Sequence, residues 1–119
     1  MWLMTKHGFY SIVEKKPGEF HIRSRECRDL ENLKERVPMP GCQVLDTPDG
    51  DYAARIIADR GTVSAVLCFL ADSLDYPNFK AEIDHTPDQC HKPYHEVWGV
   101  MARALGSYGR PGQRTRKRQ

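Results

Sequence analysis

The feature that most constrains this chain is a pair of short turn signals, each placed between two segments in which apolar and polar residues alternate. The alternating segments are residues 2–14, 19–24, 43–47 and 52–58. Pro17-Gly18 separates the first two segments, and Asp49-Gly50 separates the last two. Because proline presets a turn angle and glycine accepts positive φ, these pairs predict two β-hairpins and therefore four strands.

Between and after the hairpins, the apolar spacing changes from two residues to that of a helix. Asp29 is a suitable N-cap for the first helix, and Pro38 ends it. The sequence predicts helices at 29–37, 63–74, 78–83 and 94–105, with a short helical turn at 86–89. Pro93 is expected to separate that turn from the last helix.

The predicted order is β-β-α-β-β-α, with further helical segments after it. If the fourth strand inserts between the two strands that the first helix connects, the result is a four-stranded antiparallel sheet with the helices on one face. Such an α+β architecture is a ferredoxin-like plait in circularly permuted form, because its edge strand has moved from the C-terminus to the N-terminus.

The size of the chain, 119 residues, and a charged fraction of 29% fit one globular domain, which we expect at 1–105. Residues 106–119 are predicted to be a flexible basic tail. This tail has no acidic residue, and its basic residues are Arg110, Arg114, Arg116, Lys117 and Arg118. Such a tail either remains solvated or contacts a polyanion such as nucleic acid.

The longest apolar run, Ala65 to Ala71, is seven residues and too short to cross a membrane. The N-terminus lacks the basic and apolar stretches of a secretory signal. The four cysteines form no CxxC pair, so we expect reduced thiols in a cytoplasmic protein.

Several segments of the predicted domain share a pattern with other chains. They are Gly8-Phe9-Tyr10-Ser11-Ile12-Val13, Thr47-Pro48 with Asp51-Tyr52 and Arg55-Ile56, Tyr76 with Asn78-Phe79-Lys80, and Tyr94-His95-Glu96-Val97-Trp98. Together they resemble a family of short, uncharacterised bacterial proteins. The resemblance implies a compact cytosolic domain and assigns no activity and no cofactor. No phosphate-binding glycine loop, GxSxG or HExxH motif is present.

One candidate site is the sheet face turned away from the helices. If Phe20 points to the helices, alternation places His21 and Arg23 on the other face, together with Arg55 of the fourth strand. Tyr10 is a further candidate for this face. Guanidinium and aromatic groups suit a polyanion, and the same face with its free edge strand also suits a protein partner or a second copy.

A second candidate site centres on His95, at the border of the last apolar stripe, as an acid or base. Arg23, Arg55, Lys80 and Tyr76 are predicted to surround it if they converge on one pocket. That pocket would serve a small enzyme or sensor for a phosphate- or carboxylate-bearing compound. Half-buried packing with a hydrogen bond is the alternative for His95.

A cluster of four possible zinc ligands is the third candidate: His85, Cys90, His91 and His95. Their spacing differs from that of structural zinc sites. His91 and His95 share a helix face only if the helix runs through Pro93, so we expect no metal site. The leading hypothesis is a non-catalytic module that binds a protein partner and also nucleic acid, and the small enzyme or sensor is the alternative.

Overall fold

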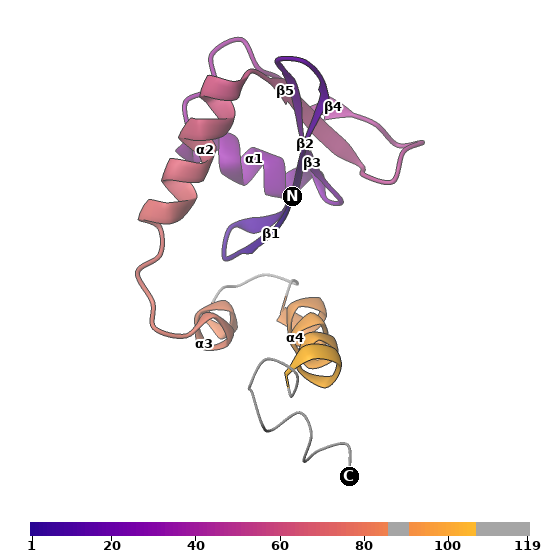
Figure 1. Ribbon diagram of the computed structural model, residues 1–119. Coiled ribbons are helices and arrows are strands. Elements are labelled where there is room, and N and C mark those ends of the chain that lie inside the picture. Colours follow the sequence, from indigo (N-terminus) through magenta and orange to yellow (C-terminus); the bar gives the residue numbers. More distant parts are fainter. Residues whose placement is uncertain (86–90, 107–119) are drawn as a thin grey trace. The chain divides into compact units, whose positions relative to one another are not determined.

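The computed structural model describes residues 1–85 and 91–106. They fall into two compact units, Met1–Pro77 and a second unit that begins at Asn78 (Figure 1). The prediction of one domain over 1–105 stays a prediction. The elements confirm the α+β class.

The first unit contains a five-stranded sheet. Its strands are β1 (Trp2–Thr5), β2 (Gly8–Lys16), β3 (Glu19–Ser24), β4 (Leu45–Asp46) and β5 (Ala54–Ala58). They pair antiparallel in the order β1-β2-β3-β5-β4. As the favoured topology requires, β5 lies between β3 and β4, the two strands that the first helix connects.

The predicted count of four strands is not confirmed, because the segment 2–14 is a hairpin rather than one strand. The side chain of Thr5 makes the turn: its hydroxyl oxygen accepts from the backbone N–H of His7 and of Gly8, each at 3.1 Å. The chain reverses there, and β1 pairs with β2 as an additional edge strand. The ferredoxin-like plait is likewise not confirmed.

Helices occupy segments close to those predicted. They are α1 (Cys27–Arg36) and α2 (Arg60–Asp72) in the first unit, and α3 (Phe79–Asp84) and α4 (His91–Leu105) in the second. The expected break at Pro93 is wrong, because α4 already begins at His91. Pro93 is in the first turn of α4, where the proline's missing N–H removes no helical hydrogen bond.

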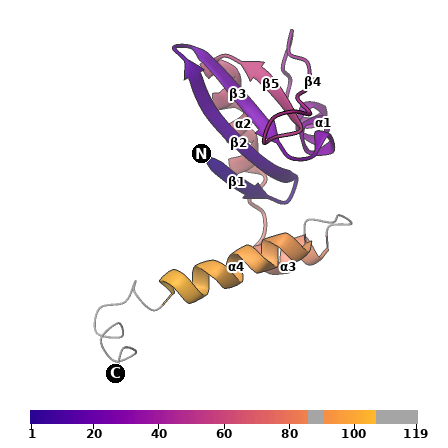
Figure 2. The ribbon, with the colours of Figure 1, turned by 90° about the vertical axis from the view of Figure 1, so that its right-hand side faces the viewer.

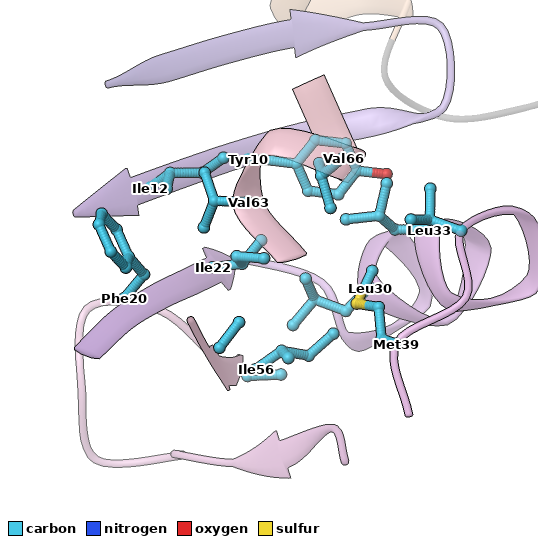
Figure 3. Packing of buried hydrophobic residues seen from close by; sticks show 13 residues of the cluster. Tyr10, Ile12, Phe20, Ile22, Leu30, Leu33, Met39, Ile56, Val63 and Val66 are labelled. Carbon is cyan, nitrogen blue, oxygen red and sulfur yellow. The ribbon is translucent and has the colours of Figure 1, made fainter. Parts of the chain in front are cut away.

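The core of the first unit lies between one face of the sheet and the helices α1 and α2. Figure 3 shows Ile12, Phe20, Ile22 and Ile56 from the strands beside Leu30 of α1. Figure 2, a quarter turn from Figure 1, shows the strands in front with α2 behind them. The alternation seen in the sequence therefore separates a helix-covered face from the opposite face.

Asp29 joins α1 to the second strand instead of capping the helix as predicted. The N-cap position is Glu26, and Asp29 is buried in the first turn of α1. Its Oδ2 accepts from the backbone N–H of Phe9 at 3.1 Å, and its backbone oxygen accepts from the Tyr10 hydroxyl at 2.8 Å. Gly8 permits this close approach at a φ of 155°.

Among the residues that the structure describes, no helix combines the length and the apolar character that crossing a membrane requires.

We expect Gly8→Ala to lower the free energy of unfolding by about 2–3 kcal/mol. A Cβ at this position would lie 2.5 Å from Cγ of Asp29, and the backbone conformation disfavours a side chain. Urea unfolding measures the change. Gly61→Ala is the control: it adds a methyl group in α2 with ordinary contacts, so it should leave stability equal or raised. Equal losses in both variants would contradict the contact with Asp29.

We expect the first unit to lose stability as the pH falls below about 6.5, the ordinary pKa of histidine. Burial lowers the pKa of His7, and the charges of Arg36 and Lys6 lower it further. The unfolded chain therefore binds this proton at a higher pH than the folded chain, and acid favours unfolding. Urea unfolding at pH 7.5 and 5.5 should show a smaller decrease for His7→Gln than for the wild type, whereas His85→Gln, at an exposed position, should keep the wild-type decrease.

Candidate functional site

The sheet face turned away from α1 and α2 carries a continuous row of side chains across all five strands. Directly opposed residues of antiparallel strands share a face. The pairing register therefore places in one row Trp2, Ser11, Arg23, Arg55 and Leu45. A second row consists of Val13, His21 and Ile57. We call these eight residues the open face.

The predicted division of the strand residues between the two faces of the sheet is confirmed for β3 and for Arg55. Phe20 and Ile22 are buried against the helices, and Arg23 and Arg55 are directly opposed on the other side of the sheet. Two arginines therefore meet at the centre of the open face, on the two central neighbouring strands.

Arg23 is held in place by two neighbours. Its NH2 group donates to Oγ of Ser11 at 2.8 Å, and Ser11 is 1% exposed. Its guanidinium carbon lies 4.5 Å from the centre of the Tyr52 ring, and that of Arg25 lies 4.8 Å from the same ring. Tyr52 thus supports two positive charges at this end of the open face.

Arg55 is linked to an acidic residue through a histidine. Its NH1 group lies 3.0 Å from Nδ1 of His21, and Nε2 of His21 lies 3.1 Å from Oε2 of Glu19. Because a guanidinium is always a donor, Nδ1 is the acceptor and Nε2 carries the proton in the neutral ring. The hydrogen bond to His21 also holds the pKa of Glu19 below its ordinary value.

Neither Arg23 nor Arg55 forms an ion pair with a carboxylate among the described residues. The Nε atom of each is buried without a hydrogen-bond partner. Two adjacent like charges with unused donors are unfavourable in a folded protein unless an anion joins them. The centre of the open face is therefore chemically suited to an anionic group.

Apolar side chains flank this centre. Trp2 is 73% exposed, Ile57 42% and Leu45 39%, although each is a large hydrophobic residue. The ring of Trp2 packs edge to face on that of Phe9, with the centroids 6.3 Å apart. Exposed apolar residues around a charged centre are typical of a surface that binds another molecule.

The assignment of Tyr10 to the open face is wrong. Tyr10 is paired with Leu3, is fully buried on the helix side and belongs to the core. Alternation alone did not decide which residues of β2 face the helices. In the structure Tyr10 and Ile12 do, and Ser11 and Val13 are on the open face. Tyr52 lies before β5 and packs on Arg23 outside the helix-side cluster.

Two further predicted binding residues are not among the eight residues of the open face. Tyr76 is at the end of the first unit, where Nζ of Lys6 is 5.4 Å from its ring centre. Lys80 is in α3 of the second unit, where its Nζ lies 3.7 Å from the ring centre of Trp98. The predicted convergence of both on one pocket with the arginines stays a prediction.

His95 has a carboxylate partner within the second unit. Its Nε2 lies 2.9 Å from Oδ1 of Asp84, and both side chains are partly exposed. A carboxylate in this position orients an imidazole. A hollow of about 610 Å³ lies against α4. It is lined by His95, Glu96, Gly99, Val100 and Arg103.

Parts of two predicted sites lie outside the described residues. They include Cys90 of the metal cluster and the tail residues Arg110, Arg114, Arg116, Lys117 and Arg118. Within 1–85 and 91–106, no group of three or more His, Cys, Asp or Glu residues could hold a metal ion.

Ser11 and Trp2 of the open face, and the support of Arg23 by Tyr52, are among the features that sequence reasoning missed. Ser11 lies opposite Arg23 by register, and Trp2 belongs to an edge strand that the sequence did not separate from β2. Tyr52 stacks on Arg23 from a loop. A polar residue inside an otherwise apolar strand was the available signal for Ser11.

Comparisons of this chain with protein-family models, with curated proteins and with solved structures find no match. Its function is therefore argued from its geometry alone.

We expect Tyr52→Ala to destabilise the first unit by about 2–3 kcal/mol, because the buried ring supports two guanidinium groups. Tyr52→Phe keeps the ring and removes only the hydroxyl group, so it should stay within about 0.5 kcal/mol of the wild type. Chemical unfolding of the three proteins measures both effects. A loss in Tyr52→Phe as large as in Tyr52→Ala would show that the hydroxyl group, not the ring, carries the contribution.

Proposed function

We propose that the protein is a small, non-catalytic interaction module that binds a protein partner through the open face. The observation that carries this proposal is the exposure of Trp2, Ile57 and Leu45 around Arg23 and Arg55. Tryptophan and arginine are the residue types that contribute most to binding energy at protein interfaces. Removal of apolar side chains from water by a partner also lowers the free energy of the complex.

The face suits a partner because its central charges are already positioned. Arg23 is fixed by Ser11 and Tyr52, and Arg55 by His21. Ordering a free arginine on binding costs up to about 1.5 kcal/mol. Contacts that hold both guanidinium groups in the free protein reduce that cost. The partner is a different protein or a second copy of this chain.

Nucleic acid contact through the same face and the basic tail remains part of the proposal, because guanidinium groups also bind phosphate. The resemblance to short bacterial proteins and a cytoplasmic location agree with such a module and stay predictions.

A small enzyme or ligand sensor is the alternative, and one observation favours it. The hydrogen bond between His95 and Asp84 beside a hollow of α4 is an arrangement in which a histidine can move a proton. An enzyme of this kind would lose turnover in His95→Ala and keep it when the open face is changed. An interaction module would respond in the opposite way.

We expect Trp2→Ala with Ile57→Asp to reduce partner binding by about 10-fold or more, because the change removes an exposed anchor and places a charge on the apolar part of the face. The full-length protein is immobilised, and the proteins it retains from cells that express it are quantified by mass spectrometry. Sedimentation at rising concentration tests a second copy as the partner.

Leu74→Ala is the matched control, since Leu74 is 67% exposed but follows α2 and lies off the sheet. It should retain the wild-type partners and the wild-type sedimentation. Retention of the same proteins at the same level by the wild type and both variants would contradict binding through the open face.

A further inference from the structure

We propose that Arg23 and Arg55 form a carboxylate-binding site, and that the partner segment on the open face is an acidic, apolar peptide. This inference rests on the proposed function, since it names the chemistry of the partner at the same surface. It follows from three properties of the arginine pair: its unbalanced charge, its fixed geometry and its apolar surroundings.

The charge of the pair is unbalanced within its own unit. Arg23 and Arg55 are directly opposed on β3 and β5, and neither has a carboxylate partner among the described residues. Two acidic residues near the open face have other hydrogen-bond partners. Glu19 accepts from His21, and Asp46 accepts from Cys27. Asp46 is opposite Ala54, so it alternates with Leu45 and is on the other face of the sheet. A negative group placed between the guanidinium groups would relieve their repulsion and accept charge-assisted hydrogen bonds from their terminal NH groups.

The geometry of the pair favours a planar, two-oxygen acceptor. Each guanidinium carries five N–H donors in one plane, and each makes one hydrogen bond to a neutral acceptor, Arg23 to Ser11 and Arg55 to His21. Neighbouring strands are separated by about 4.8 Å. One carboxylate can therefore accept from both arginines, or two carboxylates can each accept from one.

The surroundings favour a peptide over a nucleic acid as the source of the anion. Leu45 continues the arginine row on one side, and Ile57 lies in the next row beside His21. Aliphatic side chains match those of a peptide, whereas single-stranded nucleic acid is bound by successive aromatic platforms. Among the residues of the open face, Trp2 is the aromatic side chain that is exposed. An extended segment that alternates acidic and aliphatic residues therefore fits the face.

The test uses the full-length protein and four labelled probes of equal length. The first is a decapeptide of alternating leucine and aspartate, the second replaces aspartate with asparagine, and the third replaces leucine with serine. The fourth is a uridine decanucleotide. Fluorescence anisotropy at fixed ionic strength gives each affinity. The leucine–aspartate peptide should bind about 10-fold or more tightly than the asparagine peptide, because charge-assisted hydrogen bonds are replaced by neutral ones.

Two variants of equal charge locate the site. Arg23→Gln with Arg55→Gln should abolish the preference for aspartate over asparagine. Arg28→Gln with Arg36→Gln removes the same charge from exposed positions on α1 and should keep that preference. Arg23→Lys with Arg55→Lys keeps the charge and removes the planar donors, so it should lose most of the preference and retain its salt dependence.

A measurement on the wild-type protein guards against variants that fail to fold. The Nε–Hε resonances of Arg23 and Arg55 in a ¹H–¹⁵N spectrum should shift on addition of the aspartate peptide and remain in place with the asparagine peptide. Unshifted resonances at saturating peptide would overturn the carboxylate site.

The remaining outcomes separate this inference from the proposed function. If both leucine peptides bind equally, and Trp2→Ala with Ile57→Asp abolishes their binding, the face binds protein but the arginine pair is no carboxylate site. If the decanucleotide binds more tightly than any peptide through Arg23 and Arg55, the partner is a nucleic acid and the peptide assignment is wrong. Absence of binding by every probe would also overturn the inference.

Discussion

The register between β3 and β5 is the constraint on which the rest of this structure depends. Arg23 faces Arg55, and Ile22 faces Ile56, in directly opposed pairs. A shift of one residue would turn each strand's apolar row to water and its charged row to the helices. Burial of Ile22 and Ile56 beneath α1 and α2 therefore holds both arginines at the centre of the open face.

The open face holds two guanidinium groups in fixed positions without neutralising their charge within the first unit. Ser11, Tyr52 and His21 fix the two guanidinium groups, yet within 1–85 and 91–106 no carboxylate pairs with either of these neighbouring groups. A protein that needed these arginines only for its own stability would place an acidic residue between them. Contacts that position a charge without neutralising it are typical of binding surfaces, where the partner supplies the opposite charge.

Elements with strong local signals were predictable. Turn residues and alternation located both hairpins, and the apolar spacing located α1, α2 and α4 to within a few residues. Elements that depend on contacts distant in sequence were not. Asp29 looked like an N-cap because aspartate favours that position, but the backbone of Phe9 competes for its carboxylate. The additional β1–β2 hairpin was missed because Thr5, rather than glycine or proline, forms its turn.

The second unit shows the same division. An apolar stripe predicted α4, and the position of His95 at its border was visible in the sequence. The bond from His95 to Asp84 required the pairing of α3 with α4, which no local pattern specifies. Lys80, a predicted binding residue, lies over the ring of Trp98, a contact that no local pattern specifies.

The sequence by itself determined which residues are apolar, where the chain can turn, and that Arg23 lies opposite in parity to Phe20 and Ile22. These properties depend on residue type and on the period of two in a strand, which are local. Only the tertiary structure decided that Tyr10 lies in the core, that Trp2 extends the arginine row, and that Tyr52 supports Arg23. Strand pairing and loop packing bring together residues distant in the chain, and their free energy is contained in no single segment.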